Sequence, residues 1–543
     1  MRVQSFTSAL LIIAVSIISL NSCNRSAKKV KKKRDTVHKA WNKTIPGSFS
    51  EQTILVFDSG KVATFLTQYP ELDAYKSDIR NFYTKRKYAY AWFEKNALIE
   101  QAGNLANRVM NIQQEGIYKA PPYQKKLDSL LYTVNSAKKQ KPNPELELML
   151  TAQYFVFAKM AWNGLSSAES KASSWYVPRK KISYDQYLDS LLSAKGRSAD
   201  EPVYRQYDLL RGFLKKYTQL DTLEKWAPIV AAKTLKPGDS SAVIAKIKRR
   251  LFQLSDFKGD TTGALYDTTL QASVKQFQER HGLYISGQVN KATLTELNVT
   301  PKDRIRQILV NMERSRWLPV SVDKDYLAVN IPEFKLHVYH ADSLLWSCNV
   351  VVGQTVHQTT VFYGEVKYIV FSPYWNVPPG ILKNEILPGM RRNPNYLAAH
   401  NMELTGYEGK TPVIRQKPGA SNSLGLVKFL FPNSYNIYLH DTPSKSLFGE
   451  SSRAFSHGCI RVGEPARLAA FLLRDKPEWT PEKIDKAMHA GKEQYYTLKQ
   501  KVPVFIAYFT AFVNRDGRLN FRKDIYKLDE RLAATIMSGK GSY

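Results

Sequence analysis

Cysteine is scarce in this sequence, because the 543 residues include only three, at positions 23, 348 and 459. A disulfide framework needs more than one pair of cysteines, so the chain does not depend on one. The sequence also shows no zinc-knuckle, RNP or phosphate-cradling glycine pattern. These absences argue against a disulfide-stapled scaffold, a common nucleic-acid module and a P-loop nucleotide enzyme.

Acidic residues are few relative to basic ones. The chain has 48 Asp and Glu against 79 Lys and Arg, a formal net charge of +31. The excess is spread along the sequence, with one dense run, KKVKKKR, at residues 28–34. Since no nucleic-acid motif accompanies this charge, a carboxylate-rich polymer or an anionic membrane surface fits it equally well.

No long apolar run is present near the N-terminus. The stretch from Ala9 to Leu20 is too short to span a bilayer comfortably, and it ends in Leu20-Asn21-Ser22-Cys23, which resembles a bacterial lipobox. We therefore expect residues 1–22 to be a lipoprotein signal peptide and Cys23 to carry the lipid. Residues 23–50 would form a basic tether at a membrane surface, which implies a periplasm-facing protein of the bacterial cell envelope. The alternative is a plain secretory signal in which Cys23 is incidental.

The remaining sequence divides by periodicity into three parts, which predicts a multi-domain α+β protein. Residues 51–230 carry apolar residues at three- and four-residue spacing and are predicted to be a helical scaffold. Residues 235–298 predict a compact unit of three short helices, with Asp267 as an N-cap. Residues 325–543 alternate in the manner of strands, with a single clear helix at 465–473.

Cys459 is the unusual cysteine. Cys348 lies in an apolar, strand-like run and is expected to be a small core residue. Cys459 instead follows Ser456, His457 and Gly458 in a polar segment. Three interpretations are open for this segment, namely inert packing, a metal site and a nucleophilic thiol.

A nucleophile explains more of these residues than the other two interpretations. The spacing of His440, His457 and Cys459 matches no usual zinc-ligand arrangement, and a structural cysteine prefers apolar neighbours. An adjacent imidazole can convert a thiol to the reactive thiolate, and the flexible Gly458 lets main-chain N–H groups approach a substrate oxyanion. Arg461 could hold a carboxylate or fix the loop. Spacing alone does not say which histidine is the base.

Two family resemblances follow from these motifs. The order AxxxFQxxxGL and GxVxxxTxxxLN within residues 235–298 is similar to the small peptidoglycan-binding domain. The pattern from His440 to SHGCIRV at 456–462 resembles the signature of L,D-transpeptidases with a YkuD-type catalytic domain. Together with the helical segment, the chain resembles the large, multi-domain type of that family, with residues 325–543 as the catalytic domain.

The transpeptidase resemblance implies roles for the residues of the motif. It makes Cys459 the nucleophile and His440 the general base, with His457 and Gly458 shaping the thiol and oxyanion site beside Ser456. The implied reaction is a 3→3 cross-link between peptidoglycan stem peptides through a thioester, without a cofactor or a metal. The tetrapeptide donor and the amine acceptor are its partners, and no nucleic acid is involved. A carboxypeptidase using the same thiol, and a non-catalytic wall-binding lipoprotein, remain as alternatives.

The lipid anchor gives the first testable prediction. Cys23→Ala removes the acyl acceptor, so the protein should move from the membrane pellet to the supernatant after ultracentrifugation of lysed cells. Cys348→Ala is the matched control and should stay with the membranes. An unchanged membrane fraction for Cys23→Ala would rule out the anchor.

Overall fold

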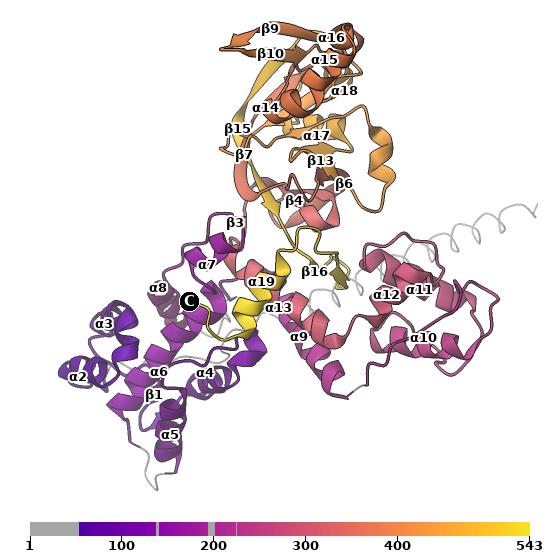
Figure 1. The fold of residues 1–543 in the computed structure, drawn as a ribbon. Coiled ribbons are helices and arrows are strands. Elements are labelled where there is room, and N and C mark those ends of the chain that lie inside the picture. Colours follow the sequence, from indigo (N-terminus) through magenta and orange to yellow (C-terminus); the bar gives the residue numbers. More distant parts are fainter. Residues whose placement is uncertain (1–53, 137–140, 194–200, 224) are drawn as a thin grey trace, which may run out of the picture. The chain divides into compact units, whose positions relative to one another are not determined.

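The computed structural model describes residues 54–136, 141–193, 201–223 and 225–543 (Figure 1). The predicted signal peptide, the tether and Cys23 lie outside these residues. The described chain forms two compact units, which we take separately. Within the described ranges, no helix is both long enough and apolar enough to cross a membrane.

The first unit is helical and contains the chain up to Ile112, Ala120–Trp162 and Lys181–Pro202. Its central helix, α6 (Pro144–Phe157), is buried at every position from Leu146 onward. Asn143 caps that helix by accepting hydrogen bonds from the N–H groups of its first turn, and Pro144 fits the first helical position. The other α-helices described in this unit are α2 (Gly60–Gln68), α3 (Lys76–Lys85), α4 (Glu100–Met110), α5 (Gln124–Asn135) and α8 (Tyr184–Ser193).

The second unit begins within the segment expected to be a helical scaffold. It contains Gln113–Lys119, Asn163–Lys180 and Val203–Tyr543. Helix α9 (Gln206–Leu223) contacts α13 (Pro301–Trp317), and strand β3 (Trp175–Tyr176) pairs in parallel with β7 (Val361–Phe371). The segment predicted to be helical therefore contributes a strand to the main sheet. Periodicity could not indicate this strand, because it is only two residues long and lies among helices.

Three helices make the compact unit expected at 235–298. They are α10 (Ala242–Gln253), α11 (Thr268–Arg280) and α12 (Lys291–Asn298). Ile247 and Leu251 are fully buried in a shared apolar core, as the helical spacing predicts. Asp267 is the N-cap of α11, and its carboxylate accepts the Leu270 N–H at 2.7 Å, which confirms that prediction.

A large sheet dominates the rest of the second unit. Its strands follow the order β11-β12-β14-β6-β5-β4-β15-β7-β3, and β11 also pairs with β7, so eight of them close into a ring. This ring places β12 and β14 side by side although β13 (Ala454–Ser456) and a 3₁₀ turn separate them in sequence. The bounds of its remaining strands are β4 (Asp325–Asn330), β5 (Lys335–His340), β6 (Ser343–Gly353), β11 (Val427–Leu430), β12 (Leu439–His440), β14 (Ile460–Val462) and β15 (Gln494–Ala507).

Short elements surround this sheet. Helix α17 (Pro465–Leu472) matches the predicted helix, and α18 (Pro481–Met488) is an addition to it. A small subdomain with its own apolar core, shown at one end of the sheet in Figure 1, follows β7 in sequence. It consists of β8 (Trp375–Asn376), α14 (Pro379–Ile381), η5 (Leu382–Ile386), α15 (Leu387–Arg392), α16 (Tyr396–Ala399), β9 (Met402–Glu408) and β10 (Thr411–Gln416).

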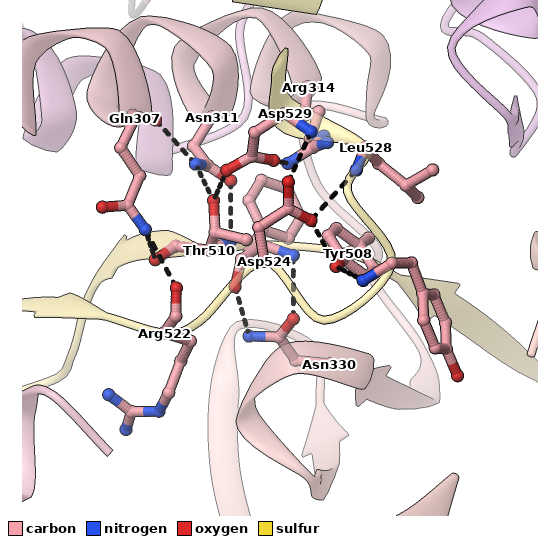
Figure 2. A network of polar contacts seen from close by, with 12 residues as sticks. Gln307, Asn311, Arg314, Asn330, Tyr508, Thr510, Arg522, Asp524, Leu528 and Asp529 are labelled. Atoms are coloured by element: carbon pink, nitrogen blue, oxygen red, sulfur yellow. Dashed lines mark hydrogen bonds and ion pairs between the residues drawn. The ribbon is translucent and has the colours of Figure 1, made fainter. Parts of the chain in front are cut away.

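The C-terminal segment folds back on α13. A hairpin of β16 (Ala511–Val513) and β17 (Leu519–Phe521) turns at Asp516-Gly517, and α19 (Asp529–Met537) follows. Figure 2 shows the polar contacts that tie this segment to α13, including an ion pair between Arg314 and Asp529 at 2.6 Å. These contacts thereby join α13, which precedes β4 in sequence, to the segment that follows β15.

A buried ion pair in α13 gives a stability prediction. Arg316 and Glu313 are both fully buried and lie 2.5 Å apart, and Glu313 also accepts the Leu165 N–H at 2.7 Å. Arg316→Met leaves a buried carboxylate without its counter-charge, which should lower the free energy of unfolding by about 3–5 kcal/mol. Urea unfolding followed by tryptophan fluorescence measures the loss.

Two further variants make this test specific. Arg306→Met removes an exposed arginine from the same helix and should change the stability by no more than about 0.5 kcal/mol. Adding Glu313→Gln to Arg316→Met should restore part of the loss, because the amide oxygen still accepts the Leu165 N–H while the charge is gone. An Arg316→Met variant with the same free energy of unfolding as the wild type would contradict the prediction.

Candidate functional site

Two short parallel strands assemble the centre of the site. Leu439 of β12 pairs with Ile460 of β14, and the Ile460 N–H donates to the Tyr438 carbonyl at 3.1 Å. Leu439 and Ile460 are both completely buried. Because side chains alternate along a strand, the preceding residues Tyr438 and Cys459 face the opposite side of the sheet together. The same alternation brings His440 and Arg461, which also pair, to that side.

Cys459 is a partly exposed free thiol in the loop before β14. Its Sγ lies 3.5 Å from the Asn436 carbonyl. Burial raises the pKa of this thiol, while the main-chain N–H and the hydroxyl of Tyr438 act in the opposite direction. Cys459 is therefore a neutral thiol at pH 7.

His440 is buried and uncharged. Burial, followed by the charge of Arg461, lowers its pKa to about 4, against the effect of nearby carbonyls that include that of Asp441. Its Nδ1 donates to the Asp441 carbonyl at 2.5 Å, which leaves Nε2 as the nitrogen that carries the lone pair. The pKa shifts of both groups thus favour a neutral thiol beside a neutral imidazole.

Arg461 adds a cationic group on the same face. Burial lowers the pKa of its guanidinium, and its Nε is buried with no hydrogen-bond acceptor among the described residues. An N–H donor in that position is suited to an anionic or carbonyl oxygen of a ligand.

The loop before Cys459 is fixed by a short hydrogen-bonded turn. The buried Ser456 hydroxyl donates to the Cys459 carbonyl at 2.5 Å and accepts the Gly458 N–H at 3.1 Å. Gly458 has a φ of +114°, a conformation that side chains with a Cβ rarely adopt. Ser456 and Gly458 therefore shape the turn that presents the thiol.

His457 makes its contacts with residues outside this hydrogen-bonded turn. It is partly exposed, and its Nε2 lies 3.2 Å from a carboxylate oxygen of Glu385 in η5. Its ring centroid is 5.2 Å from that of His357. His457 thus links the catalytic loop to the small subdomain, whereas His440 lies on the face of Cys459.

Tyr438 is a further member of this site that was not expected from the sequence. Burial, followed by the proximity of Cys459, raises the pKa of its hydroxyl, so the group stays protonated and able to donate. Its ring also meets that of His440 edge-on at 5.7 Å. The alternation Tyr438-Leu439-His440 was the available signal, since it places the tyrosine and the histidine on one face of a strand.

The other cysteine within the described residues is a core residue. Cys348 is buried in β6, as predicted, and burial raises the pKa of its thiol to about 11. In the part of the chain that the structure describes, no group of three His, Cys, Asp or Glu side chains is arranged to hold a metal ion.

Three known domain families match this chain in sequence order. Residues 77–214 match the scaffold domain, residues 240–297 the peptidoglycan binding domain and residues 324–493 the L,D-transpeptidase catalytic domain, YkuD. The chain is 31% identical over 258 residues to a Haemophilus influenzae protein named "Putative L,D-transpeptidase". That alignment covers 44% of this chain and 50% of the relative, so it spans only half of the relative's length.

Solved structures give weaker matches. A Xylanimonas cellulosilytica L,D-transpeptidase is 15% identical, with 51% of this chain and 99% of that chain covered and a TM-score of 0.18. A Stackebrandtia nassauensis L,D-transpeptidase is 13% identical, with 51% and 97% covered and a TM-score of 0.22. TM-scores this low carry no argument about the fold.

The two pKa shifts predict how the thiol titrates. In a Cys348→Ala background, the rate of iodoacetamide labelling should rise with pH through a single inflection above the ordinary thiol value of about 8.5, because burial disfavours the thiolate. No inflection is expected near pH 6.5, because His440 is already neutral there. Tyr438→Phe removes a donor that favours the thiolate and should move the inflection to higher pH.

Two results decide this prediction. Tyr435→Phe alters a partly exposed tyrosine in the same segment and should leave the profile unchanged. An inflection near pH 6.5 that disappears in His440→Ala would instead show a resting imidazolium–thiolate pair.

Proposed function

Since the chain carries an L,D-transpeptidase catalytic domain with a peptidoglycan-binding domain and a scaffold domain, we propose that it is a cysteine-dependent L,D-transpeptidase acting on peptidoglycan stem peptides. The observation that supports this most strongly is the pairing of β12 with β14. It brings Cys459, His440 and Tyr438 to one face of the sheet within the matched domain. These groups supply a nucleophile, a proton acceptor and a hydrogen-bond donor.

The first half of the reaction forms a thioester. His440 Nε2 accepts the thiol proton as Cys459 Sγ bonds to the carbonyl carbon of the third residue, a diamino acid, of a donor tetrapeptide. The bond from that carbon to the nitrogen of the terminal D-alanine then breaks. The departing amine takes the proton from His440, so the histidine returns to its neutral state.

The second half transfers the acyl group. The side-chain amine of a second stem attacks the thioester carbon and gives up a proton to His440 Nε2. The C–S bond then breaks, and the sulfur takes that proton from His440, which restores the thiol. The product is a 3→3 cross-link between the two stems. The low pKa of His440 keeps the imidazole unprotonated, and therefore free to accept a proton, throughout the neutral range.

Two donors fit the developing oxyanion. The Gly458 N–H already donates to Ser456, so the N–H of Cys459 itself and the Tyr438 hydroxyl are the groups we assign to the oxyanion. The unpaired Nε of Arg461 suits a substrate carboxylate, and His457 with Glu385 would border the bound peptide.

The proposal also includes a cellular location, and two alternative functions use the same residues. We propose a lipid on Cys23 and a place in the bacterial cell envelope, where the wall polymer lies and where the +31 charge favours a carboxylate-rich substrate. Hydrolysis of the thioester by water would make the protein an L,D-carboxypeptidase with the same thiol. A wall-binding protein without catalysis would leave Cys459 unacylated.

Muropeptide analysis tests this function directly. Wild-type protein incubated with purified disaccharide tetrapeptide should release D-alanine and form a 3→3 dimer. Cys459→Ala should abolish both products, because no nucleophile remains. His440→Ala should lower the rate by about 10²–10⁴-fold, the range typical of lost acid–base catalysis.

Each other outcome points to a different function. Release of D-alanine with a tripeptide product and no dimer would identify a carboxypeptidase. An unchanged tetrapeptide, with no mass added to Cys459 by a β-lactam, would identify a binding protein. Cys348→Ala is the matched control and should keep full activity, because that thiol lies buried in β6.

A further inference from the structure

A hydrogen bond from outside the catalytic loop holds the peptide bond between Gly458 and Cys459. The buried Thr359 hydroxyl donates to the Gly458 carbonyl at 2.7 Å. That carbonyl and the Cys459 N–H belong to one planar trans peptide, so they point in opposite directions. Fixing the carbonyl therefore fixes the direction of the N–H that we assign to the oxyanion.

This peptide needs such a restraint because it follows a glycine. Gly458 lies at φ +114°, and an added Cβ would find no atom closer than 3.9 Å, so the surrounding space does little to confine it. A glycine also has access to more backbone conformations than any other residue. Rotation of the peptide would turn the Cys459 N–H away from the substrate while leaving the thiol in the site.

The direction of the Thr359 hydroxyl is itself determined. The Gly353 N–H donates to Thr359 Oγ1 at 2.9 Å, so the hydroxyl proton is directed to the Gly458 carbonyl. The chain folds tightly over Gly353, where a Cβ would lie 2.1 Å from the His357 carbonyl oxygen. The loop after β6 is thus closely packed at this point.

Tyr526 clamps the two ends of that loop together. Its hydroxyl donates to the Gly353 carbonyl at 2.5 Å and accepts the Thr359 N–H at 3.2 Å. Both Tyr526 and Thr359 are buried, at 4% and 2% exposed. Tyr526 therefore holds Thr359 in the position from which it reaches Gly458.

The network in Figure 2 anchors Tyr526 in turn. The Tyr526 N–H donates to the Tyr508 hydroxyl at 2.8 Å, and that hydroxyl donates to Asp524 at 2.6 Å. Asp524 also accepts the N–H of Asp529, whose carboxylate pairs with Arg314 of α13. These residues lie outside the matched stretch 324–493, before it in α13 and after it in the C-terminal segment.

From these contacts we propose that Thr359 and Tyr526 are positioning residues that keep the Cys459 N–H directed at the reaction's oxyanion. The C-terminal segment thereby completes a catalytic site whose reacting groups all lie within the matched domain. This inference rests on the proposed function, because it presupposes acyl transfer at Cys459. It adds two residues that act through the main chain and do not touch the substrate.

Two reactions of one thiol separate this role from general stability. Acylation by a β-lactam passes through an oxyanion, whereas alkylation by iodoacetamide does not. Thr359→Val removes the hydroxyl at nearly constant shape and should slow acylation by about 10–100-fold, less than the 10²–10³-fold cost of removing an oxyanion donor outright. Its alkylation rate and the pH profile of alkylation should match those of the wild type.

Further variants test whether the two hydroxyl groups act through these hydrogen bonds. Thr359→Ser keeps the hydroxyl and should recover most of the acylation rate. Tyr526→Phe loosens the clamp and should slow acylation without slowing alkylation. Thr535→Val and Tyr363→Phe are matched controls, because those hydroxyls bond to Arg531 and Glu365 away from the loop, and both variants should acylate at the wild-type rate.

The outcomes separate the two proposals. If the wild type is acylated and Thr359→Val is acylated equally fast, the positioning role is wrong. If Thr359→Val slows acylation and alkylation alike, the two residues only support the fold and the positioning role is again wrong. If the wild-type thiol is alkylated by iodoacetamide but never acylated, the proposed function itself fails.

Discussion

The site depends on the parallel pairing of two very short strands, β12 and β14. The register Leu439 with Ile460 buries two apolar side chains on one face. The other face then receives Tyr438, His440, Cys459 and Arg461, because side chains alternate along strands. A shift of one residue would exchange the two faces and bury the thiol in the core, so apolar burial on one side enforces the chemistry on the other.

Burial has opposite effects on the two partners, and both effects favour uncharged groups. It raises the pKa of the Cys459 thiol and lowers that of His440. For each of the two groups, the loss of solvation on burial is the largest influence on its pKa. In the proposed reaction the proton therefore moves during the attack on the substrate, and negative charge develops on the carbonyl oxygen at that stage. A site of this kind depends on its hydrogen-bond donors more than one with a preformed thiolate does.

Sequence patterns identified part of this arrangement. The Asp267 cap and the helix predicted at 465–473 follow from local physical chemistry, and the structure contains both. The motif around Cys459 and His440 led to the catalytic domain that the family comparison matches. The roles of the individual residues remain proposals.

Other features depend mainly on contacts between residues that are distant in sequence. Tyr438 is one of many tyrosines, and its proximity to Cys459 arises from strand pairing across the loop between them. The protonation states depend on burial, which one sequence does not give. The contacts of Thr359 with Gly458 and Tyr526 span 99 and 167 residues. Such contacts are fixed by the closed sheet and by the anchored C-terminal segment, and no spacing rule anticipates them.

The anchoring of the C-terminal segment on α13 also bears on the order of folding. Arg314 and Asp529 are separated by 215 residues, and the sheet lies between them in sequence. Contacts of such long range form late, because a large loop must close before they are made. On a ribosome or during passage across a membrane, the thiol and the histidine emerge well before Asp529 does. The thiol and the histidine would therefore remain in an incompletely folded site until α19 has emerged and packed against α13.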